Sequence, residues 1–223
     1  MKNRIKELQT FLILWSTQSL SQLGSAMTNF ALTLWLYEQT GSALRTALLS
    51  ICSYAPYVCM SIFAGAISDR WDKRKIMLGC DTFAACCTVT VLVLLKNDLL
   101  MPWHMYLLNA VNGLMNTVQQ PAGDVAMTLV IPKKHYQRAS GLRSLSNSLI
   151  TILNPMLATS LYAFAGLDTV IYVDLATFAA AFAALFFWIR IPAVSEKELD
   201  RVPFFCAVRS GLRYLRDNRM ILT

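Results

Sequence analysis

The sequence predicts an all-α membrane protein with six transmembrane helices, and three observations lead to that prediction. First, 56% of the 223 residues are hydrophobic and only 15% are charged, whereas a soluble domain carries about a quarter charged residues. Second, long intervals contain no acid or base. Third, the basic residues gather in alternate connections between those intervals. This composition argues against a soluble globular domain and excludes a disordered chain.

The charge-free intervals define the predicted helices. Thirty residues between Glu7 and Glu38 carry no charge, and similar intervals run over 46–68, 99–123 and 144–167. Two more, around 76–95 and 169–189, are each interrupted by one aspartate. A bilayer core of about 30 Å requires ~20 apolar residues in a helix. The predicted spans are roughly 10–37, 44–68, 76–96, 103–126, 140–165 and 169–190. The first is too long and too polar to be a cleaved signal peptide.

The distribution of lysine and arginine predicts the orientation. With the N-terminus in the cytoplasm, the cytoplasmic segments hold 18 of the 20 basic residues, and only Arg45 and Lys96 lie outside. These segments are 1–9, 69–75, 127–143 and 190–223. The formal charge of +7 therefore belongs to the cytoplasmic face of a membrane and not to a nucleic-acid-binding surface. No cysteine has metal-ligand spacing with a histidine, so neither a metal nor a cofactor is expected.

Polar residues inside three spans recur at helical spacing. They are Gln18, Gln22, Ser25 and Asn29 in the first span, Asn109, Asn112, Asn116 and Gln119 in the fourth, and Ser144, Asn147, Thr151 and Asn154 in the fifth. An amide facing lipid would leave hydrogen-bonding groups unsatisfied. The stripes therefore indicate either hydrogen bonds between helices or a polar cavity. The predicted cavity-lining residues are Gln18, Gln22, Asn29, Asn109, Asn112, Asn116 and Asn147.

Two aspartates lie inside predicted spans. Asp81 and Asp174 each follow a charge that marks the start of a span, Lys75 and Asp168, by six residues. Because a helix rises 1.5 Å per residue, both should lie several Å inside the membrane boundary. Ionisable groups at such positions are costly and are functional candidates. Two interpretations stay open: each aspartate caps a helix or pairs near the interface, or one serves in proton coupling or cation recognition.

The connection between the second and third spans carries the most specific motif. Gly65, Asp69 and Arg70, followed by the basic run 73–75, resemble the G-x-x-x-D-R-x-G-R-[KR] loop of the major facilitator superfamily, with Asp72 in place of the second glycine. The resemblance to the macrolide-efflux and enterobactin-exporter branch extends over nearly the whole chain. It includes the stretches 18–25, 120–122, 129–132 and 209–215, together with Asn147, Asn154-Pro155 and the Asp174…Phe178 pattern.

The resemblance implies the N-terminal half of a secondary transporter, built as two inverted three-helix repeats. The implied activity is export of amphipathic small molecules, such as drugs, macrolides or siderophores, by alternating access and with proton exchange. The implied partners are the substrate, protons, the lipid bilayer of a bacterial cytoplasmic membrane, and a C-terminal six-span half or a second copy. The implied gating residues are Gly65, Asp69, Arg70, Lys73, Arg74 and Asp124. The fifth span carries only Pro155 of the family's antiporter motif, so no proton relay is visible in the sequence itself.

Residues 1–191 are the predicted six-span bundle, and 192–223 form a basic cytoplasmic linker with an amphipathic helix that stops where a seventh span would begin. Two alternatives to a working transporter remain. One is a fragment that does not transport by itself. The other is a six-span intramembrane hydrolase, which needs an embedded nucleophile with a base. The chain has no G-x-S-x-G motif, and its histidines, His104 and His135, lie near an outer edge and in a loop. No enzymatic activity is therefore expected.

Overall fold

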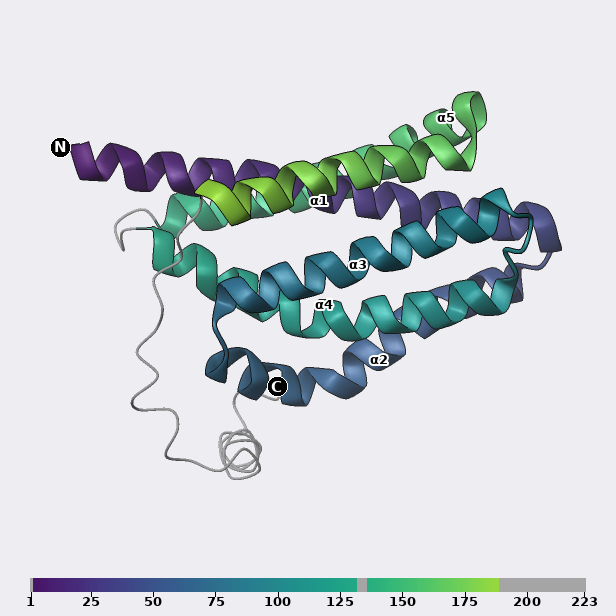
Figure 1. Cartoon of the computed structure of the whole chain (residues 1–223), viewed down its shortest axis with the longest axis horizontal. Helices are drawn as coiled ribbons and strands as arrows, with labels where there is room; N and C mark the ends of the chain where they lie inside the picture. The colour runs from purple at the N-terminus through teal and green to yellow at the C-terminus, as the bar shows by residue number, and fades with distance from the viewer. Residues whose placement is uncertain (1, 132–135, 189–223) are drawn as a thin grey trace.

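The computed structural model describes residues 2–131 and 136–188, with side chains described at 10–61, 71–129, 131 and 136–187. Every regular element over these residues is helical, which confirms the predicted all-α class for this part of the chain. The elements are α1 (Lys2–Thr40), α2 (Ala43–Arg70), α3 (Lys73–Lys96), α4 (Pro102–Val130), α5 (Tyr136–Ala183) and the π-helix η2 (Ala184–Trp188). Figure 1 shows the arrangement: α1 packs mainly against α5, α2 packs against α4, and α3 contacts both α4 and α5.

Gly166 divides α5 into two limbs that run in opposite directions. Its φ of 79° and ψ of 171° belong to a region that is essentially reserved for glycine. Ser146 and Asp174 would lie about 42 Å apart in a continuous helix. Yet they bond to Ser19 and Ser25, which lie only about 9 Å apart along α1. The chain therefore folds back at Gly166, between the fifth and sixth predicted spans, and the predicted connection is reduced to a single non-helical residue.

Side-chain caps and glycines fix the other helix boundaries. Gly41 has a φ of 60° and opens the turn between α1 and α2, where the Ser42 hydroxyl accepts from the Arg45 backbone N–H at 3.5 Å. Asp72 caps α3 by accepting from the Arg74 backbone N–H at 2.9 Å. This explains the aspartate that departs from the family motif, since aspartate is a favoured N-cap residue.

Two glycines allow close helix contacts. A Cβ at Gly113 of α4 would lie 2.1 Å from the Ser53 carbonyl oxygen of α2. A Cβ at Gly24 of α1 would lie 2.3 Å from Thr177 Oγ1 and 3.1 Å from the Asp174 Cα of α5. Small residues at helix crossings are typical of membrane bundles, because they let backbones approach. The two glycines therefore set the spacing of the two principal helix pairs.

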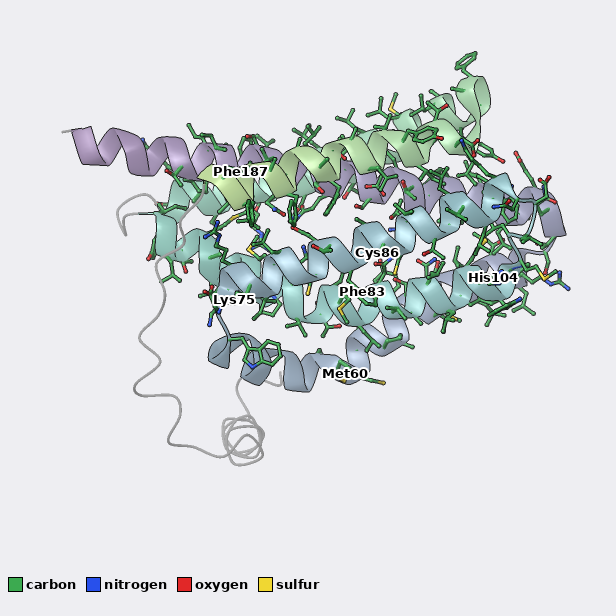
Figure 2. All side chains as sticks on the ribbon, in the orientation of Figure 1. Met60, Lys75, Phe83, Cys86, His104 and Phe187 are labelled. Carbon is green, nitrogen blue, oxygen red and sulfur yellow. The ribbon has the colours of Figure 1, made fainter. Side chains whose placement is uncertain are left out.

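Large apolar side chains cover the outside of the bundle. Ile152 is 62% exposed, Met156 64% and Phe187 76%, and Figure 2 shows many side chains projecting outward from the helices. Such broad apolar exposure is unusual for a soluble monomer. Among the described residues, two elements are long and apolar enough to cross a membrane, Lys73–Lys96 and the kinked Tyr136–Phe187. Six separate spans stay a prediction.

Candidate functional site

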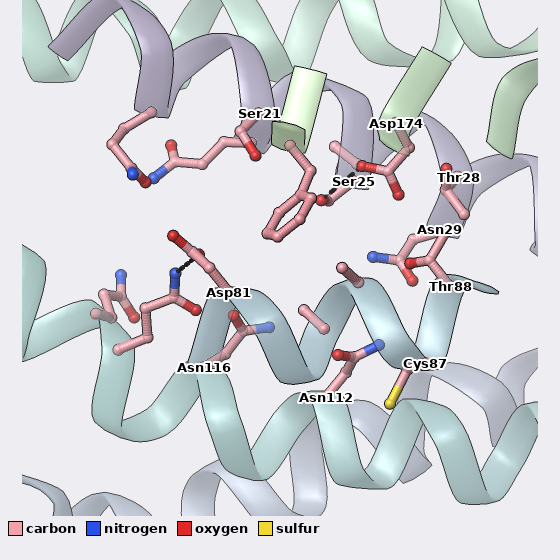
Figure 3. A pocket seen from close by; sticks show the side chains of 18 of the residues that line it. Ser21, Ser25, Thr28, Asn29, Asp81, Cys87, Thr88, Asn112, Asn116 and Asp174 are labelled. Atoms are coloured by element: carbon pink, nitrogen blue, oxygen red, sulfur yellow. Dashed lines mark hydrogen bonds between the residues drawn. The ribbon is translucent and has the colours of Figure 1, made fainter. Parts of the chain in front are cut away.

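A cavity of about 670 Å³ lies between the helices, and residues of α1, α2, α3, α4 and both limbs of α5 line it. All seven amide residues selected from the sequence lie along it. They are Gln18, Gln22, Asn29, Asn109, Asn112, Asn116 and Asn147. In Figure 3, Asn112 and Asn116 project from α4 toward the space below α1.

Helical periodicity explains why the stripes of α1 and α4 reach the cavity. Every member of both stripes, Ser25 and Gln119 included, is among the lining residues. The cavity stretch lies between two apolar clusters along the same helices. One cluster includes Leu36 and Met105, and the other includes Leu14 and Ala126. Apolar packing on either side thus leaves the polar faces turned toward a shared central space.

The polar residues predicted as a stripe in the fifth span do not all reach the cavity. Only Asn147 of that stripe lines the cavity, joined there by the preceding Ser146. Ser146 is buried and accepts a hydrogen bond of 3.2 Å from the Ser19 hydroxyl. Thr151 instead donates to the Asn147 carbonyl oxygen of its own helix at 2.8 Å, a local bond that threonine commonly makes within helices. The first limb of α5 therefore lines the cavity only near its beginning, whereas the second limb lines it through Asp174, Leu175 and Phe178.

Asp81 is buried on α3 and is held by amide groups. Gln119 of α4 donates its side-chain N–H to the Asp81 carboxylate, and Gln18 of α1 also lies against that carboxylate. The side chain is only 8% exposed. Asp81 thus connects α3 to α4 and lies close to α1, which favours the pairing role among the two interpretations that the sequence left open.

Asp174 is buried on the second limb of α5 and is surrounded by hydroxyl groups. The Ser25 hydroxyl of α1 donates to its Oδ1 at 2.9 Å. Thr28 of α1 and Thr88 of α3 also lie beside the carboxylate, and Figure 3 shows these side chains gathered around Asp174. At 4% exposure, Asp174 is as well buried as the apolar core.

The gating residues implied by the family resemblance are described in part. Gly65, Asp69 and Arg70 belong to α2, but their side chains lie outside the described residues, as does the whole predicted linker 192–223. The Lys73 amine donates to the Trp71 carbonyl oxygen at 3.0 Å. Asp124 forms an ion pair with Arg143 of α5, a partner that the sequence did not suggest.

Arg74 connects the beginning of α3 to the end of the sixth helical segment, 167–188, which comprises the second limb of α5 and η2. Its guanidinium Nη2 donates to the carbonyl oxygens of Leu185 at 3.3 Å and Phe186 at 2.6 Å. Figure 2 accordingly shows Lys75 and Phe187 at one end of the bundle and His104 at the other. Arg74 therefore satisfies carbonyl groups that a helix end leaves without partners.

The bundle buries three polar groups beside the cavity without a hydrogen-bond partner among the described residues. They are Trp15 Nε1, the Gln18 amide nitrogen and Thr28 Oγ1. Only Gln18 was selected, and for its stripe alone. Trp15 and Thr28 each lie three residues from a stripe member, Gln18 and Ser25, so helical spacing carried a signal for both. Buried polar groups normally have partners, which makes these three candidates for ligand contact.

The lining combines aromatic side chains with charged ones, and its acidic side chains outnumber its basic ones. Trp15, Tyr54, Tyr57 and Phe178 supply aromatic surface. The charged lining residues are Asp81, Asp124, Asp174 and Arg143, and the Arg143 guanidinium is paired with Asp124. Among the described residues, no group of three or more metal-binding side chains occurs. The arrangement is typical of a site that binds a molecule non-covalently.

The family of transmembrane secretion effectors, a branch of the major facilitator superfamily, matches residues 6–223. The chain belongs to this family. The resemblance to the major facilitator superfamily found in the sequence is therefore confirmed.

Curated relatives point to the same branch. Macrolide efflux protein A of Streptococcus pyogenes is 26% identical over 212 residues, which cover 94% of this chain and 52% of the relative. The uncharacterized MFS-type transporter YfiS of Bacillus subtilis is 24% identical over 213 residues, which cover 94% of this chain and 50% of the relative. The chain thus spans about half the length of the curated relatives it matches. No solved structure matches the chain significantly.

Proposed function

We propose that this transporter exports amphipathic small molecules, such as drugs, macrolides or siderophores, out of the bacterial cytoplasm by alternating access with proton exchange. The observation that carries the proposal is the amide-lined cavity between the helices. The name of the streptococcal relative, a macrolide efflux protein, supports outward transport. The alternative is a chain that binds substrate but does not transport by itself.

The cavity suits an amphipathic molecule. Its volume of about 670 Å³ falls in the range of about 300–1,000 Å³ typical of small-molecule sites. Aromatic side chains such as Tyr57 and Phe178 offer apolar contact. The N–H group of Trp15, which has no hydrogen-bond partner among the described residues, offers a donor to an ether, carbonyl or hydroxyl oxygen of a substrate.

Six spans, with the N-terminus and the tail in the cytoplasm, are proposed from the helix geometry. The fold-back at Gly166 turns α5 and η2 into two antiparallel segments, and the second of them, 167–188, is about 33 Å long. This exceeds the ~30 Å of the bilayer core. The proposed bundle comprises residues 1–191, followed by the basic linker 192–223.

The cytoplasmic gate is proposed at the beginning of α3. Arg74 joins α3 to the end of the sixth segment, and Asp124 pairs with Arg143. Together with Gly65, Asp69, Arg70 and Lys73, these residues would stabilise one access state of the cavity. Because the relatives are about twice as long, we further propose that a C-terminal six-span half, or a second copy, supplies the opposite cavity wall.

The test is accumulation of a radiolabelled macrolide in efflux-deficient bacteria. Cells would carry either this chain or this chain joined to the C-terminal half of the streptococcal relative. Lowered accumulation that a protonophore abolishes supports the proposal. If only the joined protein lowers accumulation, the chain by itself does not transport. Unchanged accumulation with both proteins present in the membrane refutes the proposed export.

A matched pair of variants ties the assay to the cavity. Asn112 lines the cavity, whereas Asn97 lies at the end of α3, away from the lining, where its side chain donates to the Val93 carbonyl oxygen at 2.7 Å. Asn112→Ala should weaken export of the macrolide severalfold, and Asn97→Ala should leave it unchanged. Equal export by both variants would argue against substrate binding in this cavity.

A further inference from the structure

The two buried carboxylates of the cavity differ in the chemistry that surrounds them. The described neighbours of Asp81 are amides, and Gln119 turns its N–H group toward the carboxylate. The described neighbours of Asp174 are the hydroxyls of Ser25, Thr28 and Thr88. An amide nitrogen is a donor only, whereas a hydroxyl oxygen also carries lone pairs. A cation can therefore be coordinated beside Asp174 but not beside the N–H group that faces Asp81.

The hydroxyl groups around Asp174 come from two helices other than its own. Ser25 and Thr28 belong to α1 and Thr88 to α3. Thr28 is only 5% exposed, and its hydroxyl faces the Asp174 carboxylate. No group among the described residues donates to its Oγ1, so the lone pairs of this oxygen are available to a ligand.

The charged residues of the cavity also favour a cation beside Asp174. Asp174 has no basic neighbour among the lining residues that the structure describes, because the one lining arginine, Arg143, pairs with Asp124. A buried carboxylate without a positive partner is costly. Hard oxygen ligands such as carboxylates and hydroxyls suit small cations, and a carboxylate also pairs with an ammonium group.

We propose that Asp174, together with Ser25, Thr28 and Thr88, binds a monovalent cation. This inference rests on the proposed function, since it defines what the transport cavity recognises. The cation is either the positively charged group of a transported compound or a free ion such as Na⁺. The Ser25 hydroxyl, which donates to Asp174 in this structure, would rotate to offer its oxygen, and Thr28 would supply a further oxygen.

The test is equilibrium binding of two probes to the purified full chain in detergent, measured by scintillation proximity with ²²Na⁺ and with ³H-tetraphenylphosphonium. Wild type should bind at least one probe. Asp174→Asn keeps the shape of the side chain and removes its charge, and should weaken that binding by tenfold or more. Thr28→Val keeps shape and removes one oxygen, and should weaken it severalfold. Binding of ²²Na⁺ identifies a free ion as the ligand, and binding of the phosphonium identifies an organic cation.

Two further aspartates provide comparisons. Asp98→Asn makes the same change in the turn after α3, outside the cavity lining, and should leave binding within twofold of wild type. Asp81→Asn separates the two cavity carboxylates, and its binding should fall less than that of Asp174→Asn. The proposal is overturned if folded wild type binds neither probe, if Asp174→Asn and Thr28→Val bind like wild type, or if Asp81→Asn loses binding that Asp174→Asn retains. Binding without macrolide export would refute the proposed function and not this site, and export without binding would refute this site alone.

Discussion

Replacing Gly113 with alanine should force α2 away from α4 and lower the stability of the bundle. The new Cβ would lie 2.1 Å from the Ser53 carbonyl oxygen and 3.1 Å from its carbonyl carbon. Since real Cβ contacts essentially never fall below 3.0 Å and the obstructing atoms are backbone, the helices themselves must move apart. Overpacking of this kind costs about 1–3 kcal/mol, which corresponds to a fall of roughly 2–12 °C in the unfolding midpoint.

The matched control is Gly123→Ala on the same helix. Nothing lies within 4 Å of a Cβ at Gly123, and alanine is favoured over glycine in a helix by about 1 kcal/mol. This variant should therefore unfold at the wild-type temperature or above it. Thermal unfolding of the purified chains in detergent measures both. Equal midpoints for the two variants would refute the inference that the contact between Gly113 and Ser53 sets the spacing of α2 and α4.

Three further predictions concern the fold-back and the polar contacts between helices. Gly166→Ala should lower the free energy of unfolding by about 1–3 kcal/mol because of its backbone geometry, whereas Gly141→Ala, also in α5 but with an ordinary φ, should not; equal stabilities would contradict this reason. Arg74→Gln removes both bonds to the end of the sixth segment and should speed amide hydrogen exchange in η2, and unchanged exchange would show that those carbonyls need no partner. Asp124→Asn and Arg143→Gln should each lower the free energy of unfolding by no more than about 1 kcal/mol, because the ion pair is partly exposed. The double variant should lower it little more than either single variant, and a double-mutant cycle in chemical denaturation measures all three.

Helical periodicity made much of the cavity lining predictable. Gln18, Gln22 and Asn29 share one face of a helix whatever the helix packs against, because 3.6 residues per turn fixes their relative direction. The cost of exposing amides to lipid then requires that face to turn inward. The same reasoning could not separate Asn147, which reaches the cavity, from Thr151, whose hydroxyl bonds to its own helix, since both fit the same spacing.

The sequence by itself determined the helical class, the family and the polar faces of α1 and α4, because composition and period are local properties of the chain. Only the tertiary structure decided which groups meet across helices. It placed amides beside Asp81 and hydroxyls beside Asp174, although the two aspartates look alike in sequence. It also brought Gly113 against Ser53, sixty positions away. Such pairings depend on how helices cross and how far each is shifted along its neighbour, and no local pattern specifies either.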